Sequence, residues 1–194
     1  MRVLFKVLFS VTHLVFVEAL AWAAIFVYWL RADGVMIDGT QVNVRYYLYK
    51  AVVYYWSNGS VVDDHSLYTW SDKICASGAG SCFSSKQNYN ASGTAIGFLV
   101  IIIAIQIVCF VLVWTNKKIK IPIIVLYSLE LVITFVLLME YGLAIDRWFY
   151  GLKLDWAAGW WIVLCLLGVV LWGSTVNLIF FSMNVWGRRV RRRD

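Results

Sequence analysis

Four long apolar stretches alternate with polar segments along the chain. They run from about Val7 to Leu30, from Thr94 to Trp114, from Ile119 to Ala144 and from Trp156 to Val185. A helix of about 20 apolar residues crosses the hydrocarbon core of a bilayer, where backbone amides have no partner outside their own helix. The pattern therefore predicts one membrane domain over residues 1–194, built on a bundle of four transmembrane helices.

The first stretch also has features of a secretory signal. Arg2 and Lys6 precede it, and the Ala-Leu-Ala triplet at 19–21 resembles a cleavage site. The apolar run nevertheless continues past this triplet to Leu30. We therefore expect an uncleaved first helix.

Basic residues are concentrated on one side of the predicted spans. Ten of them share the side of both termini with the single acid Asp194: Arg2, Lys6, Lys117, Lys118, Lys120, Arg188, Arg189, Arg191, Arg192 and Arg193. Cytoplasmic loops carry an excess of lysine and arginine. Both termini are therefore expected in the cytoplasm and segments 31–93 and 146–155 outside, in the plasma membrane or another membrane of the secretory pathway.

Composition supports a membrane protein and argues against a nucleic-acid partner. Charged residues make up 14% of the chain, against about 25% in soluble domains. The net charge of +6 arises beside the apolar spans. The tail 187–194 is consistent with a stop-transfer anchor, a retention signal or attraction of anionic lipid, the last through Arg188, Arg189, Arg191, Arg192 and Arg193.

Two of the four cysteines lie outside the spans, in the large first loop. Disulfides persist on the secretory side of a membrane, so we expect Cys75 and Cys82 to bond to each other. The rival interpretation is a metal site, which His65 alone would not complete. Cys109 and Cys165 lie within spans and are expected to act as small packing residues.

The same loop carries glycosylation sequons and strand-like segments. The sequons begin at Asn58 and Asn90. Residues from Thr40 to Trp56 partly alternate and are rich in Val and Tyr, and Val61-Val62 could begin a return strand. Segments 66–74 and 83–88 are expected to be the arms of a disulfide-closed hairpin. We therefore predict a small antiparallel sheet over the outer ends of the helices.

The arrangement resembles the claudin and peripheral-myelin-protein superfamily. The shared features are four helices, a large first outer loop with sheet character, and Trp70 shortly before Cys75 and Cys82. This resemblance implies a claudin-like fold. It also implies that Trp70 tucks against the outer helix ends, that the disulfide holds the hairpin, and that all three residues are structural.

Amastins, surface glycoproteins of trypanosomatid parasites, look closer still. They carry a Thr, a Trp and a basic residue before a cysteine, which is similar to Thr69, Trp70, Lys73 and Cys75 here. Ser71 stands where amastins have glycine, the spacing differs by one residue, and an earlier amastin cysteine is absent.

Several polar side chains interrupt the spans. They are His13, Glu18, Gln106, Glu130 and Asn177. An acid at mid-span costs about 3 kcal/mol on insertion scales, so Glu18 and Glu130 require an explanation. We expect protonated carboxyls hydrogen-bonded to neighbours such as Gln106, Asn177, Thr134 or Ser174; a contact with another protein and an ion or proton site are the alternatives.

Glycines and tryptophans give two further expectations. Gly159, Gly168 and Gly173 in the fourth span should let helices approach closely within the bundle. Tryptophans at the span ends should anchor in the lipid interface: Trp29, Trp148, Trp156, Trp160 and Trp161 outside, and Trp114 and Trp186 inside.

The sequence contains no Walker loop and no HExxH, GxSxG or dinucleotide-binding motif. We therefore expect no enzymatic activity, no cofactor and no metal. The function expected is that of a claudin-like tetraspan glycoprotein in membrane structure, adhesion or lateral assembly, with the lipid bilayer and other membrane proteins as partners. The alternative is an accessory subunit of a larger complex such as a channel or transporter; an organellar complex is a weaker option.

Overall fold

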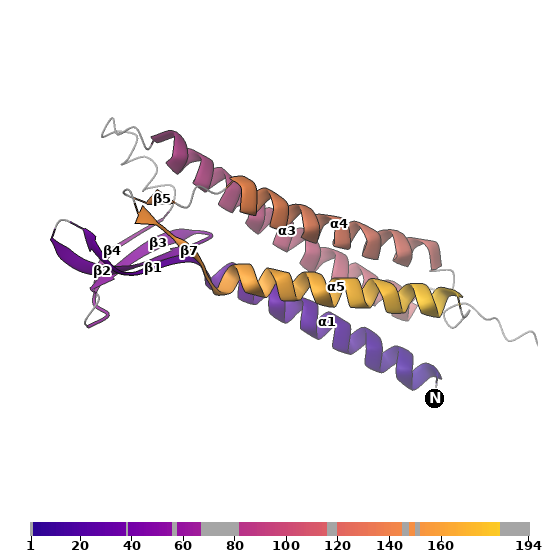
Figure 1. The fold of residues 1–194 in the computed structure, drawn as a ribbon. Helices are drawn as coiled ribbons and strands as arrows, with labels where there is room; N and C mark the ends of the chain where they lie inside the picture. The colour runs from indigo at the N-terminus through magenta and orange to yellow at the C-terminus, as the bar shows by residue number, and fades with distance from the viewer. Residues whose placement is uncertain are drawn as a thin grey trace, which may run out of the picture.

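A computed structural model describes residues 2–37, 39–55, 58–66, 82–115, 120–144, 148–149 and 152–182. Four long helices run side by side in this part of the chain (Figure 1): α1 (Arg2–Phe26), α3 (Cys82–Thr115), α4 (Lys120–Ala144) and α5 (Ala158–Ser182). Each contains a stretch that is long and apolar enough to cross a membrane: Leu8–Phe26, Gln87–Trp114, Ile121–Leu143 and Ala158–Asn177. The prediction of four spanning-length helices is confirmed.

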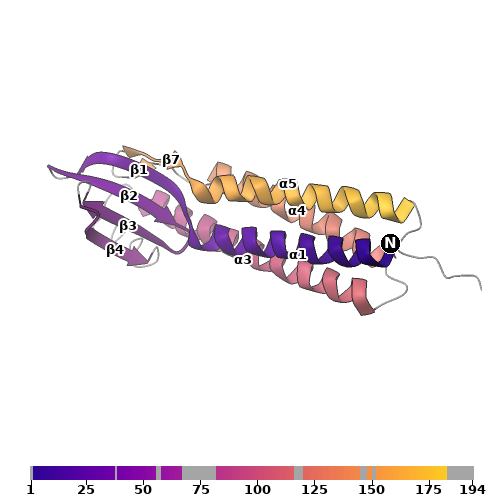
Figure 2. The same cartoon turned by 90° about the horizontal axis from the view of Figure 1, so that it is seen from below.

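A twisted antiparallel sheet stands at one end of the bundle. Its order is β4-β3-β2-β1-β7, and its strands are β1 (Tyr28–Ile37), β2 (Thr40–Tyr47), β3 (Lys50–Tyr55), β4 (Val61–Ser66) and β7 (Asp155–Trp156). A separate ribbon pairs β5 (Trp148–Phe149) with β6 (Leu152–Lys153). Figure 2 shows the strands broadside, continuing from the ends of α1 and α5. The predicted small sheet is therefore present, and the second loop contributes a strand that was not expected.

One continuous core joins the sheet to the bundle. The inward face of β2 buries Val42, Val44 and Tyr46, and these side chains share a cluster with Ala91 and Ala95 of α3. Alternate residues of a strand point to opposite faces, so one face of the sheet closes the end of the bundle. The opposite face carries the half-buried Arg45 and Tyr47.

Two predicted boundaries are wrong. The first helix ends at Phe26 instead of reaching Leu30, because β1 begins at Tyr28 and pairs with β2. The strand character predicted from Thr40 onward is confirmed by β2 and β3, which are separated by a turn between Tyr47 and Lys50. The expected start of the return strand at Val61 is confirmed by β4.

The second correction concerns segment 83–88, predicted as an arm of the hairpin and found in the first turns of α3. Small residues recur there at helical spacing, and the side chains of Asn88, Ala91, Ser92 and Ala95 are all buried. This spacing gives a helix one continuous packing stripe. Packing against the sheet therefore extends α3 well beyond the apolar stretch.

Candidate functional site

The polar side chains within the bundle form the first candidate site. Gln106 of α3 and Glu130 of α4 are both buried, and Nε2 of Gln106 donates to Oε1 and Oε2 of Glu130 at 2.7 and 2.6 Å. The hydroxyl of Thr134 donates to the backbone oxygen of Glu130 at 2.8 Å. The structure thus gives the Glu130 carboxyl a partner on the neighbouring helix.

His13 of α1 occupies a tight site against α5. Its Nε2 lies 3.3 Å from the backbone oxygen of Val169, and its ring stacks on Phe9 with a centroid distance of 5.7 Å. The edge of Tyr127 approaches to 5.3 Å. A methyl group built on Gly173 would overlap this imidazole, lying 2.6 Å from Cδ2. Gly173 is therefore the residue that admits His13, as expected of a packing glycine.

Asn177 and Ser174 do not join the carboxyls, contrary to one of the expected pairings. Nδ2 of Asn177 donates to the backbone oxygen of Gly173 at 2.8 Å, within its own helix. The hydroxyl of Ser174 donates to the backbone oxygen of Tyr127 at 3.4 Å, which ties α5 to α4.

Glu18 is the least satisfied of the intramembrane candidates. Its side chain is half-buried and its carboxyl group interacts with the side chain of Trp22, whereas the buried Oε1 has no hydrogen-bond partner within the described segments. Glu18 is close enough to Glu130 for the two carboxyls to interact electrostatically. Nδ1 of His13 is likewise buried without a partner in the described part of the chain.

The loop motif falls largely outside the described residues. Trp70 and Cys75 lie there, as do the arginine tail and residues 67–74 of the predicted hairpin arm 66–74, whereas Ser66 ends β4 and Cys82 is the first residue of α3. The disulfide and the role of Trp70 stay predictions. Cys109 is free and buried, as expected of a packing residue, but Cys165 is exposed.

The two sequons lie in different environments. Asn58 is exposed in the turn between β3 and β4, where its Oδ1 accepts from the backbone N–H of Ser60 at 2.9 Å. Asn90 is exposed on α3, but its sequon serine, Ser92, is fully buried.

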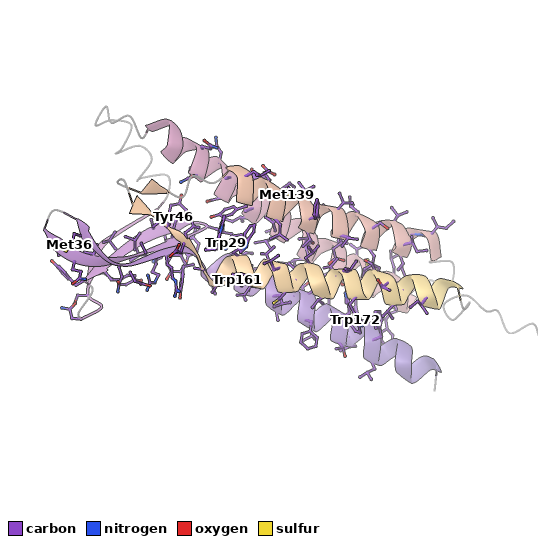
Figure 3. All side chains as sticks on the ribbon, viewed as in Figure 1. Trp29, Met36, Tyr46, Met139, Trp161 and Trp172 are labelled. Atoms are coloured by element: carbon purple, nitrogen blue, oxygen red, sulfur yellow. The ribbon has the colours of Figure 1, made fainter. Side chains whose placement is uncertain are left out.

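Trp29 was expected to anchor in lipid, and this expectation is wrong. Its side chain is 0% exposed, and Nε1 donates to the backbone oxygen of Ala24 at 2.7 Å. Its ring lies 4.5 Å from that of Tyr141, and a methyl on Gly159 would lie 2.6 Å from Cγ. Figure 3 shows Trp29 where the sheet meets the helices. The glycine in "WAAGWW" was the available signal for this contact.

A tyrosine-rich group on the outward face of the sheet was also missed. We call it the tyrosine–lysine patch: Tyr28, Tyr47, Tyr49, Arg45 and Lys50. The rings of Tyr28 and Tyr49 lie 6.1 and 5.8 Å from the ring of Tyr47. The guanidinium carbon of Arg45 lies 5.2 Å from the Tyr28 centroid, and Nζ of Lys50 lies 5.8 Å from the Tyr47 centroid. Alternation of tyrosine with lysine and arginine in "RYYLYK" was the sequence signal.

Burial raises the pKa of Tyr47 to about 12, with smaller contributions from Tyr54 and Tyr49. Its hydroxyl is protonated at neutral pH, as in an ordinary tyrosine, and hydrogen-bonds the side chain of Tyr54. Nη2 of Arg45 contacts Oδ1 of Asp33 at 2.5 Å.

No protein-family model matches the chain, and no curated protein matches it at a significant level. Among the described residues, no three His, Cys, Asp or Glu side chains form a group able to hold a metal ion.

Proposed function

We propose that this chain is a non-enzymatic, claudin-like tetraspan membrane glycoprotein that acts in membrane structure, adhesion or lateral assembly. In this proposal both termini are cytoplasmic, and the sheet stands outside a plasma membrane or another membrane of the secretory pathway. The charge bias of the flanking segments supports the orientation. The combination of four apolar helices with an antiparallel sheet after the first helix supports the likeness to claudins.

The observation that carries the proposal is the firm attachment of the sheet to the bundle. β1 follows α1 after the single residue Val27, and the backbone N–H of Ala157, just before α5, donates to the backbone oxygen of Trp29 at 2.8 Å. Trp29 is itself packed between α4 and α5. A sheet held by two helices and a shared core suits the presentation of a fixed binding face.

Cross-linking mass spectrometry on native membranes, followed by purification in mild detergent, tests this function. Lateral assembly predicts a ladder of homomeric species cross-linked through the sheet or the lipid-facing sides of α1 and α5. A chain that remains monomeric in the membrane would contradict lateral assembly.

The alternative, an accessory subunit of a larger complex such as a channel or transporter, is favoured by Glu18. A carboxyl group in a span is unfavourable in lipid, and the accessible part of the half-buried Glu18 side chain could meet a polar group on a helix of another protein. This alternative predicts fixed stoichiometry with unrelated chains. Replacing Glu18→Leu should then release the partner, while Glu18→Gln, which keeps hydrogen-bonding capacity, should retain more of it.

A further inference from the structure

Two carboxyl groups lie at nearly the same level in the middle of the bundle. α1 and α4 both run toward the sheet (Figure 1), and the ring centroids of His13 and Tyr127, one from each helix, are 5.3 Å apart. Glu18 follows His13 by five residues, and Glu130 follows Tyr127 by three. At a rise of about 1.5 Å per residue, the two acids differ in height by about 3 Å. Their carboxyl groups are close enough to interact electrostatically.

No opposite charge within the bundle neutralises this pair. The four candidate spans contain no lysine or arginine. The other titratable groups around the pair are His13 of α1, Cys109 of α3 and Tyr127 of α4, and no titratable side chain is buried in the described part of α5. The His13 ring is approached by the backbone oxygen of Val169 and the side chain of Gln106, and by no carboxyl group of the described residues. Two ionised carboxyls would therefore repel each other in hydrocarbon, where even one is unfavourable.

Gln106 can satisfy Glu130 in either protonation state. Nε2 of Gln106 donates to both carboxyl oxygens of Glu130, at 2.7 and 2.6 Å, which suits an ionised carboxyl. An amide also carries an acceptor oxygen, so a half-turn about the last side-chain bond of Gln106 would present Oε1 to a protonated carboxyl. The same partner can serve both states, and a proton can come and go without leaving an unpaired buried group, which would be unfavourable.

Glu18 supplies the second carboxyl from α1. Its half-buried side chain interacts with Trp22, while Oε1 is buried and has no hydrogen-bond partner within the described segments. A charge on either carboxyl disfavours a charge on the other. The proton is therefore a property of the pair, because each carboxyl responds to the state of its neighbour.

Buried polar side chains lead from the pair toward the end of the bundle opposite the sheet. Gln106 also interacts with His13, the edge of Tyr127 approaches the same ring, and Asn177 interacts with Tyr127. Asn177 lies five residues before the end of α5. Toward the sheet, the helices bury apolar side chains such as Leu137 of α4. This asymmetry suits a site that binds and releases a proton from one side, and not a path across the membrane.

We propose that Glu18 and Glu130 form one proton-binding site in the middle of the bundle, which carries a single proton for the two carboxyl groups at neutral pH. The pair takes this proton from water at the end of the bundle opposite the sheet and keeps one negative charge. Loss of the proton would place like charges on α1 and α4 and weaken their packing, so the packing of the bundle depends on pH. The site requires only that the helices span a bilayer.

Infrared difference spectroscopy of the purified full chain in nanodiscs, titrated with acid and base, tests this site. A protonated carboxyl gives a carbonyl band that an ionised one lacks, and the wild-type chain should show a band equal to one carboxyl at neutral pH. In Glu18→Gln and in Glu130→Gln, the remaining carboxyl should hold its proton at least about tenfold less tightly, since coupled acids interact by more than about one pK unit. Glu140→Gln removes a carboxyl near the end of the α4 span and should leave the titration unchanged.

Titration of either carboxyl that ignores the replacement of the other would overturn the proposal. A wild-type band equal to none or to two carboxyl groups at neutral pH would also overturn it, as would loss of the band when sodium replaces a bulky organic cation, because that would identify a metal-cation site. Glu18→Gln changes a half-buried side chain and should keep the wild-type thermal midpoint, so it tests the pair even if Glu130→Gln fails to fold. The band is measured on single chains, independently of the cross-linking that tests lateral assembly.

Discussion

Single residues set how closely the helices pack. A β-carbon on Gly173 would overlap the His13 ring, whereas one on Gly168 would meet nothing within 4 Å. We expect Gly173→Ala to lower the free energy of unfolding by about 1–3 kcal/mol through overpacking. Gly168→Ala should be neutral or slightly stabilising, because alanine favours helix. Thermal and denaturant unfolding in detergent measure both; equal stability of the two variants would contradict the packing described for His13.

The Gln106–Glu130 pair should act as one energetic unit. Gln106→Leu leaves the buried carboxyl of Glu130 without its Gln106 donor, and Glu130→Leu leaves Nε2 of Gln106 without this acceptor, whereas the double variant removes both groups. The double-mutant cycle should give a coupling energy of about 0.6–1.7 kcal/mol, the range for hydrogen bonds between membrane helices. Thr175→Val, on the exposed side of α5, should be additive with Gln106→Leu. A coupling near zero would show that the bond contributes nothing to stability.

The interaction partners of single residues could be predicted in part from the sequence. An acid in an apolar span must find a partner, so Glu130 and its pairing with an amide were foreseeable. The partnership of His13 with Gly173 was not, because it depends on how α1 and α5 are rotated about their axes. Gly168 illustrates the same limit, since it faces away from the neighbouring helices despite its similarity to Gly173.

At the scale of elements, Trp29 fastens the sheet to two helices. Removing a fully buried tryptophan side chain costs about 3–5 kcal/mol, so Trp29→Ala should destabilise the fold strongly. It should also loosen β1 from α5, which hydrogen–deuterium exchange would register at the backbone N–H of Ala157. Trp161→Ala, at a side chain that is 60% exposed, is the control and should change stability little. Similar losses for both variants would contradict the difference in their burial.

Element boundaries were less predictable than the elements themselves. Hydropathy located all four spans but placed Tyr28, Trp29 and Leu30 in the first helix, because apolar residues suit a buried strand and a helix equally. The start of α3 was misplaced for the opposite reason. Its first turns are polar, and only their packing against the sheet, through Ala91 and Ser92, favours helix over strand there.

At the scale of the whole molecule, several polar side chains and one face of the sheet are used for contacts within the fold. Gln106, Glu130 and Asn177 bond within the bundle, and the inward face of the sheet closes one end of it. The sequence predicted the number of spanning-length helices and the presence of a sheet. It did not predict that the segment after α1 and the segment before α5 share one sheet, because this depends on pairing between β1 and β7, which are distant in sequence.

The orientation of the molecule is tested by its two sequons. Asn58 lies in the turn between β3 and β4, at the end of the sheet far from the helices. Gly59 in this turn has a φ of +69°, a conformation that favours glycine. Asn90 lies within the candidate span Gln87–Trp114, too close to the bilayer for efficient transfer of a glycan. In cells that glycosylate secreted proteins, Asn58→Gln should abolish the glycosidase-sensitive shift in gel mobility, and Asn90→Gln should leave it unchanged. A tag after Asp194 should be labelled only after permeabilisation. An unglycosylated chain whose tag is reached on intact cells would reverse the orientation, because the sheet would then face the cytoplasm.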